Sequence, residues 1–208
     1  QEELDGLLPL VDDSRVELDG TSLTLPDGAE LDLGAVAKGY TGQHLARLIR
    51  EAGVTSALLD LGGNIQTVGC RPDGDPWRVA VRDPEGEGYA AVLEVEDEAV
   101  VTSGGYERYF EQDGVRYWHI LDPATGQPAR TGLLSVTVVG PSGTVCDALS
   151  TALFVMGPER AADYWLARED FDFLLLHEDG SVTCSEGLEG RLTLSGDWAD
   201  REIEVVRR

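Results

Sequence analysis

Asp-Gly pairs between short apolar runs constrain the fold of this 208-residue chain more than any other feature. Asp-Gly is a strong signal for the tight turn that joins two antiparallel strands, because both residues accept a positive φ. The predicted hairpins join residues 16–18 to 22–25, 65–70 to 77–82, 108–112 to 115–121, and 171–176 to 181–184. This pattern favours a largely antiparallel sheet.

Helices are predicted at residues 35–52, 144–156 and 158–168, where apolar residues recur at helical spacing. Further short strands are predicted at residues 30–33, 57–61, 89–95, 100–103 and 133–139. Many hairpins with few helices predict an α+β fold with largely antiparallel sheets and a few packed helices. Because no low-complexity linker divides the chain, we expect residues 1–208 to form a single domain.

The charge balance is strongly acidic: 39 Asp and Glu residues stand against 16 Lys and Arg residues, for a formal net charge of −23. Phosphate binding needs clustered Lys and Arg, so nucleic acid is excluded as a main partner, and an anionic membrane surface would repel the chain. Lys38 is the only lysine. Such a surface suits a salt-rich medium and a halophilic source, but a GC-rich genome would favour arginine over lysine equally well.

Cysteine usage gives no sign of a disulfide framework or of a zinc site. Cys70, Cys146 and Cys184 make an odd number, and no Cys-x-x-Cys pair occurs. The chain begins at Gln1 and shows neither an apolar run near 20 residues nor a signal peptide. We therefore expect no membrane-spanning segment within these residues.

The segment 31–40 places Asp32 at the end of a predicted strand, Gly34 in a turn and Lys38 at a helix start. Backbone N–H groups at a helix start and one ammonium group together favour phosphate. The alternative is an ordinary strand–turn–helix unit with a surface lysine. Neither of the common glycine-rich phosphate loops occurs, so the usual nucleotide-binding folds are disfavoured.

Paired glycines follow two other predicted strands, at residues 60–64 and 101–106. Glycine lets the backbone approach a ligand closely, and the second turn could present Ser103 and free N–H groups to an anion. Ordinary tight turns explain both segments equally well.

His119 lies on a predicted strand that leads into an Asp-Pro turn. The sequence places His44 on a helix exterior and His177 beside a hairpin turn, so only His119 is close to other candidate site residues. It is a candidate general base or phosphate-binding residue. The alternative is a structural histidine on a strand.

Asp147 and Thr151 are four residues apart on the predicted helix 144–156, so both project from one face. The flanking residues are mostly apolar, which predicts a buried helix and a buried carboxylate that needs a cation or strong donors. A carboxylate, a hydroxyl, a backbone carbonyl and phosphate oxygens form a hard, oxygen-only set that suits Mg²⁺. The alternative is an aspartate that pairs with an arginine.

Six segments in order give the chain a recognisable family pattern: LDLGAVAKGY, LLDLGGNIQTVG, PWRVAVRDP, VTSGGYERYF, HILDPATGQPA and SVTVVGPSGTVCDALSTALFVMGPE. Together they resemble the FAD:protein FMN transferases, the ApbE-type flavin transferases. The matching segments span residues 31–159, well over half of the chain. The resemblance implies an ApbE-like, T-fold-like architecture. Only 31 residues precede Asp32, so it also implies that the family's N-terminal segment is missing or shortened.

The resemblance also implies a reaction: Mg²⁺-dependent transfer of FMN from FAD to a Thr or Ser hydroxyl of an acceptor protein, with release of AMP. The acceptor would be a flavin-carrying subunit of a membrane redox complex, exposed outside the cytoplasm. An FAD pyrophosphatase that gives FMN and AMP, and a non-catalytic FAD-binding module, are the alternatives.

The same resemblance assigns roles to individual residues. The implied FAD-binding residues are Asp32, Lys38, Asn64, Ser103, Gly104, Tyr106, His119 and Leu121. The implied Mg²⁺ ligands are Asp147, Thr151 and the backbone carbonyl of Ala35, with Ser150 as a weaker candidate. His119 would act at the reacting phosphate, as a base or as a charge stabiliser.

Overall fold

A seven-stranded sheet forms the centre of the molecule, with the strand order β14-β12-β11-β10-β7-β4-β3. The structure, a computed structural model, describes residues 2–208, and side chains from residue 3 onward. Strands β12 and β14 are parallel, and the other pairs in this sheet are antiparallel. The strands are β3 (Ala57–Asp60), β4 (Asn64–Val68), β7 (Ala99–Gly104), β10 (Leu133–Gly140), β11 (Asp172–His177), β12 (Val182–Ser185) and β14 (Ile203–Val206).

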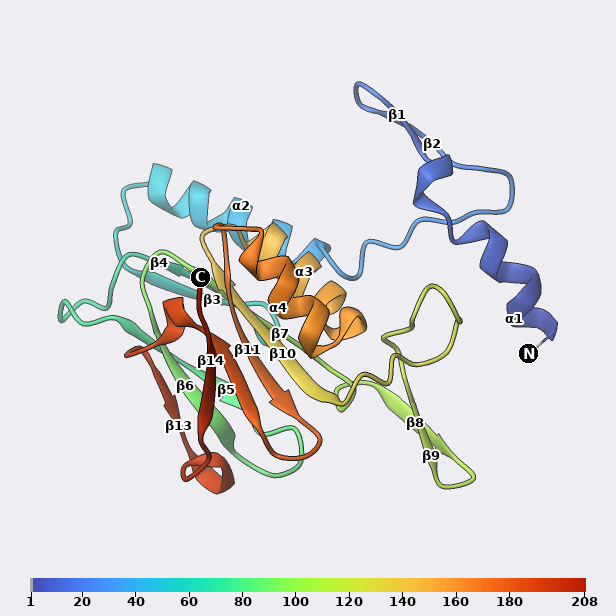
Figure 1. Cartoon of the computed structure of the whole chain (residues 1–208). Helices are drawn as coiled ribbons and strands as arrows, with labels where there is room; N and C mark the ends of the chain where they lie inside the picture. Colours follow the sequence, from blue (N-terminus) through green and yellow to red (C-terminus); the bar gives the residue numbers. More distant parts are fainter. Residues whose placement is uncertain (1) are drawn as a thin grey trace.

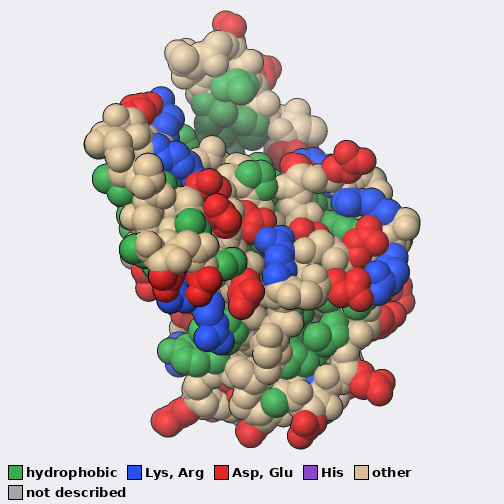
Figure 2. Space-filling view, turned by 90° about the vertical axis from the view of Figure 1, so that its left-hand side faces the viewer, with side chains coloured by type: hydrophobic (Ala, Val, Ile, Leu, Met, Phe, Trp, Pro, Cys, Tyr) green, Lys and Arg blue, Asp and Glu red, His purple; other side chains and the backbone are tan. Residues whose placement is uncertain are grey.

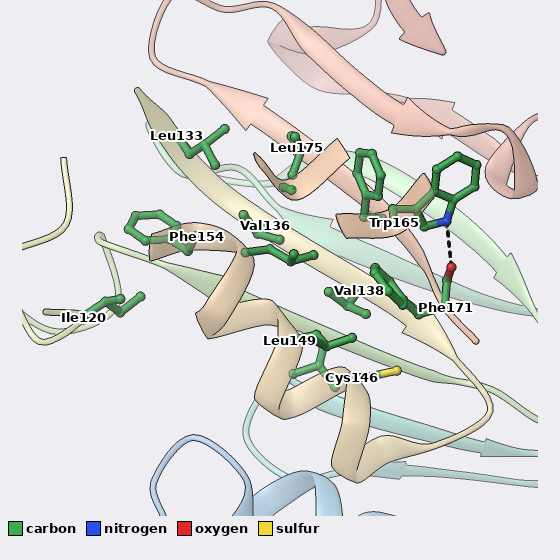
Figure 3. Packing of buried hydrophobic residues seen from close by; sticks show 14 of the residues in the cluster. Ile120, Leu133, Val136, Val138, Cys146, Leu149, Phe154, Trp165, Phe171 and Leu175 are labelled. Atoms are coloured by element: carbon green, nitrogen blue, oxygen red, sulfur yellow. Dashed lines mark hydrogen bonds between the residues drawn. The ribbon is translucent and has the colours of Figure 1, made fainter. Parts of the chain in front are cut away.

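Helices α2 (Ala37–Glu51), α3 (Gly143–Met156) and α4 (Pro158–Leu166) lie on one face of this sheet (Figure 1). Apolar side chains of α3 and α4 and alternate residues of β10 and β11 form a buried core (Figure 3). Trp165 is fully buried there, and its indole N–H donates to the carbonyl oxygen of Phe171 at 2.8 Å. This packing fixes α3, the helix predicted to carry the metal ligands, against the central strands.

A three-stranded sheet of β5 (Trp77–Arg82), β6 (Tyr89–Val95) and β13 (Leu192–Leu194) covers the other face. Because side chains alternate along a strand, residues between those of the first core point to this second sheet. Val139, Leu174 and Leu176 of the central sheet therefore pack with Leu93 and other apolar residues of the smaller sheet. The result is a helical layer over two sheets.

Two peripheral units project from these layers (Figure 1). The first contains α1 (Glu2–Leu7) and the hairpin of β1 (Glu17–Asp19) and β2 (Ser22–Thr24), and it rises at the top of Figure 2. The second is the hairpin of β8 (Tyr109–Gln112) and β9 (Val115–Trp118). Short 3-10 turns occur at Leu8–Leu10, Asp13–Arg15, Glu186–Leu188 and Gly196–Trp198. The leucine side chains at positions 4 and 8 lie close to Gly126, which links the first unit to the turn after β9.

The face in Figure 2 carries many acidic side chains with basic ones among them. Surface ion pairs include Arg50 with Asp97 at 2.5 Å and Arg207 with Glu189 at 2.7 Å. Within residues 2–208, no helix has the length and apolar character needed to cross a membrane.

The α+β class with mainly antiparallel sheets is confirmed, and the three large helices lie within two residues of their predicted limits at each end. One predicted hairpin is wrong. Strand β4 pairs with β3 and β7, so both of its edges are occupied, and β5 pairs with β6 in the other sheet. The turn at residues 72–74 therefore connects two sheets.

The predicted strand at residues 30–33 is also wrong, because no neighbouring strand pairs with it. Leu31 and Leu33 are more than half exposed there. The strand predicted at residues 115–121 ends at Trp118, so His119 lies just beyond it. Strands β13 and β14 lie in a C-terminal stretch for which the sequence analysis predicted no strand.

Candidate active site

Helices α2 and α3 cross with their backbones in contact at Gly39 and Gly143. A Cβ atom on Gly39 would lie 2.0 Å from the carbonyl oxygen of Gly143 and 2.6 Å from the Cβ of Asp147. Real Cβ atoms do not approach a backbone oxygen so closely, so the crossing needs glycine at position 39. It brings the first turn of α2 against the face of α3 that carries Asp147.

Asp147 is only 4% exposed and accepts a hydrogen bond from the backbone N–H of Gly39, with Oδ2 at 2.7 Å. The first turn of α2 has no capping side chain of its own, since the residue before it is Val36. Asp147 therefore supplies the acceptor that a local cap would normally provide. The predicted burial and strong donor are confirmed. The alternative of an arginine partner is not found: within residues 2–208, no ion pair includes Asp147.

Burial raises the pKa of the Asp147 carboxyl above its ordinary value. The Gly39 N–H, the charge of Lys38 and the side chain of Asn64 oppose this shift. Asn64 begins β4 and is 2% exposed, and its amide lies close enough to the Asp147 carboxyl to lower the pKa of that group. Its Nδ2 meets no acceptor at full hydrogen-bond geometry within residues 3–208, so it can still donate to a ligand oxygen.

Three hydroxyl groups of β7 and α3 contact one another, and one of them reaches the backbone of Asp147. Ser103 Oγ, near the end of β7, is 2.8 Å from Ser150 Oγ and 3.1 Å from Thr151 Oγ1. Ser150, which is fully buried, also donates to the backbone carbonyl oxygen of Asp147 at 2.9 Å. The structure thus brings Asp147, Asn64 and these three hydroxyls into one cluster, which we call the Asp147 cluster.

The donors of this cluster are oxygen atoms, the kind that Mg²⁺ prefers. Among residues 2–208 there is no group of three or more His, Cys, Asp and Glu side chains placed to hold a metal ion. A metal at Asp147 would therefore rely on one carboxylate together with hydroxyl, carbonyl and substrate oxygens. Mg²⁺ in proteins is usually coordinated in this way, by few protein ligands together with water or phosphate oxygens. The residues present fit such an ion.

The segment before α2 forms a tight turn. Asp32 Oδ1 accepts the backbone N–H of Gly34 at 2.5 Å, and the carbonyl oxygen of Leu33 accepts from residues 36 and 37. Asp32, Ala35 and Lys38 are all exposed along this turn and the first helical turn. The Lys38 charge is close enough to lower the pKa of Asp147, so the only lysine of the chain lies beside the cluster.

Gly104 and Tyr106 continue the chain from Ser103. The Tyr106 ring lies against Gly104, where a Cβ atom would be 2.3 Å from a ring carbon. Burial raises the pKa of the Tyr106 phenol to about 12, so it is neutral at physiological pH. Tyr106 lines a pocket of about 440 Å³ together with Tyr109, Trp118 and residues of other segments.

His119 directly follows β9 and is exposed. Its Nδ1 is 3.3 Å from the carbonyl oxygen of Arg108, which also accepts the His119 backbone N–H at 3.2 Å. A carbonyl oxygen can only accept, so this contact places the proton of a neutral imidazole on Nδ1 and leaves Nε2 as the base. Leu121, half exposed, bridges to Pro128 in the following turn. In the described part of the chain, no hydrogen bond joins His119 or Leu121 to the Asp147 cluster.

Sequence reasoning missed the importance of Gly39 and Gly143. The sequence does contain a pattern that points to them. Gly39 lies four residues before the polar residue Gln43 in one helix, and Gly143 lies four residues before Asp147 in another. Small residues inside helices often mark close helix crossings.

Comparison with known proteins places this chain in a family. The family model described as "ApbE family" matches residues 1–175. A protein of Treponema pallidum named FAD:protein FMN transferase is 44% identical over 176 residues, which is 79% of this chain and 48% of that protein. A protein of the same name from Escherichia coli K12 is 39% identical over 158 residues, 75% of this chain and 44% of that protein. The chain thus spans about half the length of the curated relatives it matches.

Solved structures agree with this assignment. The crystal structure of the ApbE protein of Thermotoga maritima superposes with a TM-score of 0.84 and 34% identity, over 91% of this chain and 63% of that one. The flavin transferase ApbE of Vibrio cholerae gives a TM-score of 0.76 and 30% identity, over 95% of this chain and 61% of that one. From the extent of the family match and the identity to these relatives, the chain belongs to the ApbE family.

Proposed function

We propose that this chain transfers FMN from FAD to a Thr or Ser hydroxyl of an acceptor protein and releases AMP. The observation that carries this proposal is the Asp147 cluster: a buried carboxylate with a raised pKa, set beside hydroxyl groups, a lysine and the start of α2. The family membership supports it, since the curated relatives are named FAD:protein FMN transferase.

Asp147, Thr151 and the backbone carbonyl of Ala35 would hold Mg²⁺. Ser150 remains a candidate ligand, although its hydroxyl already has two protein partners, Ser103 and the carbonyl oxygen of Asp147. When bound, the ion would neutralise pyrophosphate charge and polarise the phosphorus that reacts. The protein's part is to keep the Asp147 carboxylate buried and oriented, which the Gly39 N–H does.

FAD would bind along the same surface. The Lys38 ammonium group and the N–H groups of the first turn of α2 favour the pyrophosphate. The Nδ2 of Asn64, beside Asp147, offers one more donor. The other residues that we assign to FAD are Asp32, Ser103, Gly104, Tyr106, His119 and Leu121.

His119 would accept the proton of the acceptor hydroxyl. The hydroxyl oxygen forms a bond to the phosphorus of the FMN half, and the P–O bond to AMP breaks. AMP leaves with that electron pair, and the proton passes to Nε2 of His119. The Nδ1–H contact to the Arg108 carbonyl orients the imidazole for this role. We propose a flavin-carrying subunit of a membrane redox complex, exposed outside the cytoplasm, as the acceptor.

The test is incubation of the protein with FAD, Mg²⁺ and membranes from source cells that lack the gene. AMP is measured by chromatography, and covalent flavin by fluorescence of a denaturing gel. Fluorescent protein together with AMP supports transfer. Free FMN and AMP without fluorescent protein would make the chain an FAD pyrophosphatase. Intact FAD would contradict both activities and favour a binding module. A parallel reaction with EDTA shows whether the metal is needed.

A further inference from the structure

The contact between α2 and α3 is reciprocal: each helix caps the start of the other. Asp147 of α3 accepts from Gly39 in the first turn of α2 at 2.7 Å. In return, Gln43 of α2 accepts from the backbone N–H of Thr144, in the first turn of α3, at 3.1 Å. Backbone N–H groups at a helix start have no partner within their own helix, so each cap satisfies a group of the other helix.

Gln43 binds the start of α3 through more than one group. Its Oε1 also accepts from the hydroxyl of Ser142 at 2.9 Å and from the hydroxyl of Thr144 at 3.0 Å. Ser142 in turn caps α3 by accepting from the N–H of Val145 at 3.3 Å. One side-chain oxygen of α2 therefore orders the residues that begin α3.

The spacing makes the two caps a single unit. Gln43 is four residues after Gly39 in α2, and Asp147 is four residues after Gly143 in α3. Four residues are about one helical turn, so both capping side chains are one turn beyond the point where the backbones touch. No side chain separates the helices at this point. A change in the cap at Gln43 is therefore transmitted to Asp147 through a rigid, closely packed crossing.

We propose that Gln43 is a positioning residue for the Asp147 cluster. By holding the start of α3 against α2, it sets the position of Asp147 and Thr151 relative to Ala35 and Lys38. This inference rests on the proposed function for its metal, but the coupling of the two helices does not depend on it. Gln43 is not a ligand and acts only through α3.

The first measurement needs neither metal nor FAD: amide hydrogen exchange at Gly39, followed by NMR in the metal-free protein. Gln43→Ala removes the acceptor for three donors. We expect the Gly39 amide, which Asp147 caps on the other side of the crossing, to exchange at least ~10-fold faster in this variant. The reason is that local opening follows the loss of local contacts. Gln43→Glu keeps an acceptor oxygen at the same reach and should remain within about 3-fold of the parent. Thr144→Val, which deletes one donor, should give a smaller change in the same direction and remains measurable if Gln43→Ala does not fold.

The second measurement is Mg²⁺ titration in the presence of FAD, well below the melting temperature. Residues that orient metal ligands typically change metal affinity about 10–100-fold, so Gln43→Ala should bind Mg²⁺ about 10-fold more weakly, with rescue by Gln43→Glu. Val182→Ala is the matched control, because it is buried in β12 within the second core and lowers stability without touching the crossing.

The outcomes distinguish the positioning role of Gln43 from the proposed Mg²⁺ site at Asp147. Parent-like exchange at Gly39 in Gln43→Ala, or equal acceleration in Val182→Ala, would overturn the positioning role. If the parent itself binds no Mg²⁺, the metal assignment of the proposed function fails, while the exchange measurement still decides whether Gln43 holds Asp147.

Discussion

The Ser103 hydroxyl lies 3.1 Å from the Thr151 hydroxyl, a contact that ties β7 to the face of α3 that carries Asp147. A hydroxyl that gives a lone pair to a metal ion can still donate its proton, so Thr151 can bind Ser103 and a cation together. Helix α3 therefore has two attachments at the candidate site: Ser103 on the sheet and Gly39 on α2. A substitution that removes the Ser103–Thr151 contact should therefore leave the Gly39–Asp147 hydrogen bond in place, and the reverse should also hold.

Gly39→Ala should separate α2 from α3. The added Cβ would meet the carbonyl oxygen of Gly143 at 2.0 Å, and this oxygen belongs to a helix backbone, which cannot turn aside as a flexible side chain can. Forcing an extra carbon into such a contact typically costs about 1–3 kcal/mol. We expect a melting temperature several degrees lower and weaker Mg²⁺ binding, measured by calorimetry and titration.

Gly6→Ala is the control for this substitution. Gly6 is also helical, in α1, and no atom lies within 4 Å of the position that its Cβ would take. Alanine favours helices over glycine by ~1 kcal/mol, so the melting temperature should stay unchanged or rise slightly. Equal losses in both variants would show that the Gly39 crossing has no special role.

Asp147→Asn should stabilise the metal-free protein at neutral pH. Burial raises the pKa of Asp147 above its ordinary value of 3.8. A carboxyl with a raised folded-state pKa contributes stability that is fully present below pH 3.8 and is lost as pH rises through the raised pKa. The variant has no such loss, and its amide oxygen can still accept the Gly39 N–H. For a domain of this size, ~1 kcal/mol corresponds to about 2–4 °C.

The measurement is thermal unfolding of parent and Asp147→Asn in EDTA between pH 4 and pH 8. The melting temperature of the variant should exceed that of the parent at pH 7, and the difference should shrink toward pH 4. A variant that melts below the parent by the same amount at every pH would show that the carboxylate charge has no stability cost in the fold.

Part of this site could be predicted from local sequence. Asp147 and Thr151 share a face because helical spacing is a local property, and the apolar residues around them indicated burial. The partners of these residues could not be predicted in the same way. Ser103 meets Thr151, and Gly39 meets Gly143, across about 50 and 100 residues of chain, and such contacts depend on the order of strands in the sheet.

The wrong hairpin shows the same limit in the fold. Residues 72–74 do form a turn, as their Pro-Asp-Gly sequence indicates. The turn signal cannot tell whether the flanking strands pair with each other, and here β4 has its neighbours in one sheet while β5 joins another. By contrast, the hairpin predicted across Asp113-Gly114 is confirmed, because β8 and β9 form a two-stranded sheet in which each strand has only the other as its partner.

His119→Asn should lower FMN transfer by roughly 10²–10⁴-fold, the usual contribution of a general base. An asparagine side chain can still donate to the Arg108 carbonyl, as Nδ1 of His119 does, but it offers no base. The melting temperature should therefore change little, and FAD affinity should fall much less than FMN transfer. Transfer within a few-fold of the parent, in a folded variant, would end the catalytic assignment of His119.

The acidic charge predicts a response to salt. With 39 acidic and 16 basic residues, self-repulsion should destabilise the fold at low ionic strength. The screening length falls from about 10 Å at 0.1 M salt to about 3 Å at 1 M, so the melting temperature should rise over this range of KCl. A melting temperature that does not rise with KCl would leave genome composition as the explanation for the excess of arginine over lysine.

The most direct test of the central claim is Mg²⁺ titration of the FAD-bound protein, parent against Asp147→Asn, by calorimetry. The claim is that the Asp147 carboxylate holds the metal on which FAD cleavage depends. Removing a direct carboxylate ligand should weaken Mg²⁺ binding by more than ~100-fold, beyond the effect of supporting residues. Thr151→Ala should be milder, because a neutral hydroxyl contributes less than a charged group. The account predicts saturable Mg²⁺ binding in the parent and none detectable in Asp147→Asn; equal Mg²⁺ affinity in the two proteins would contradict it.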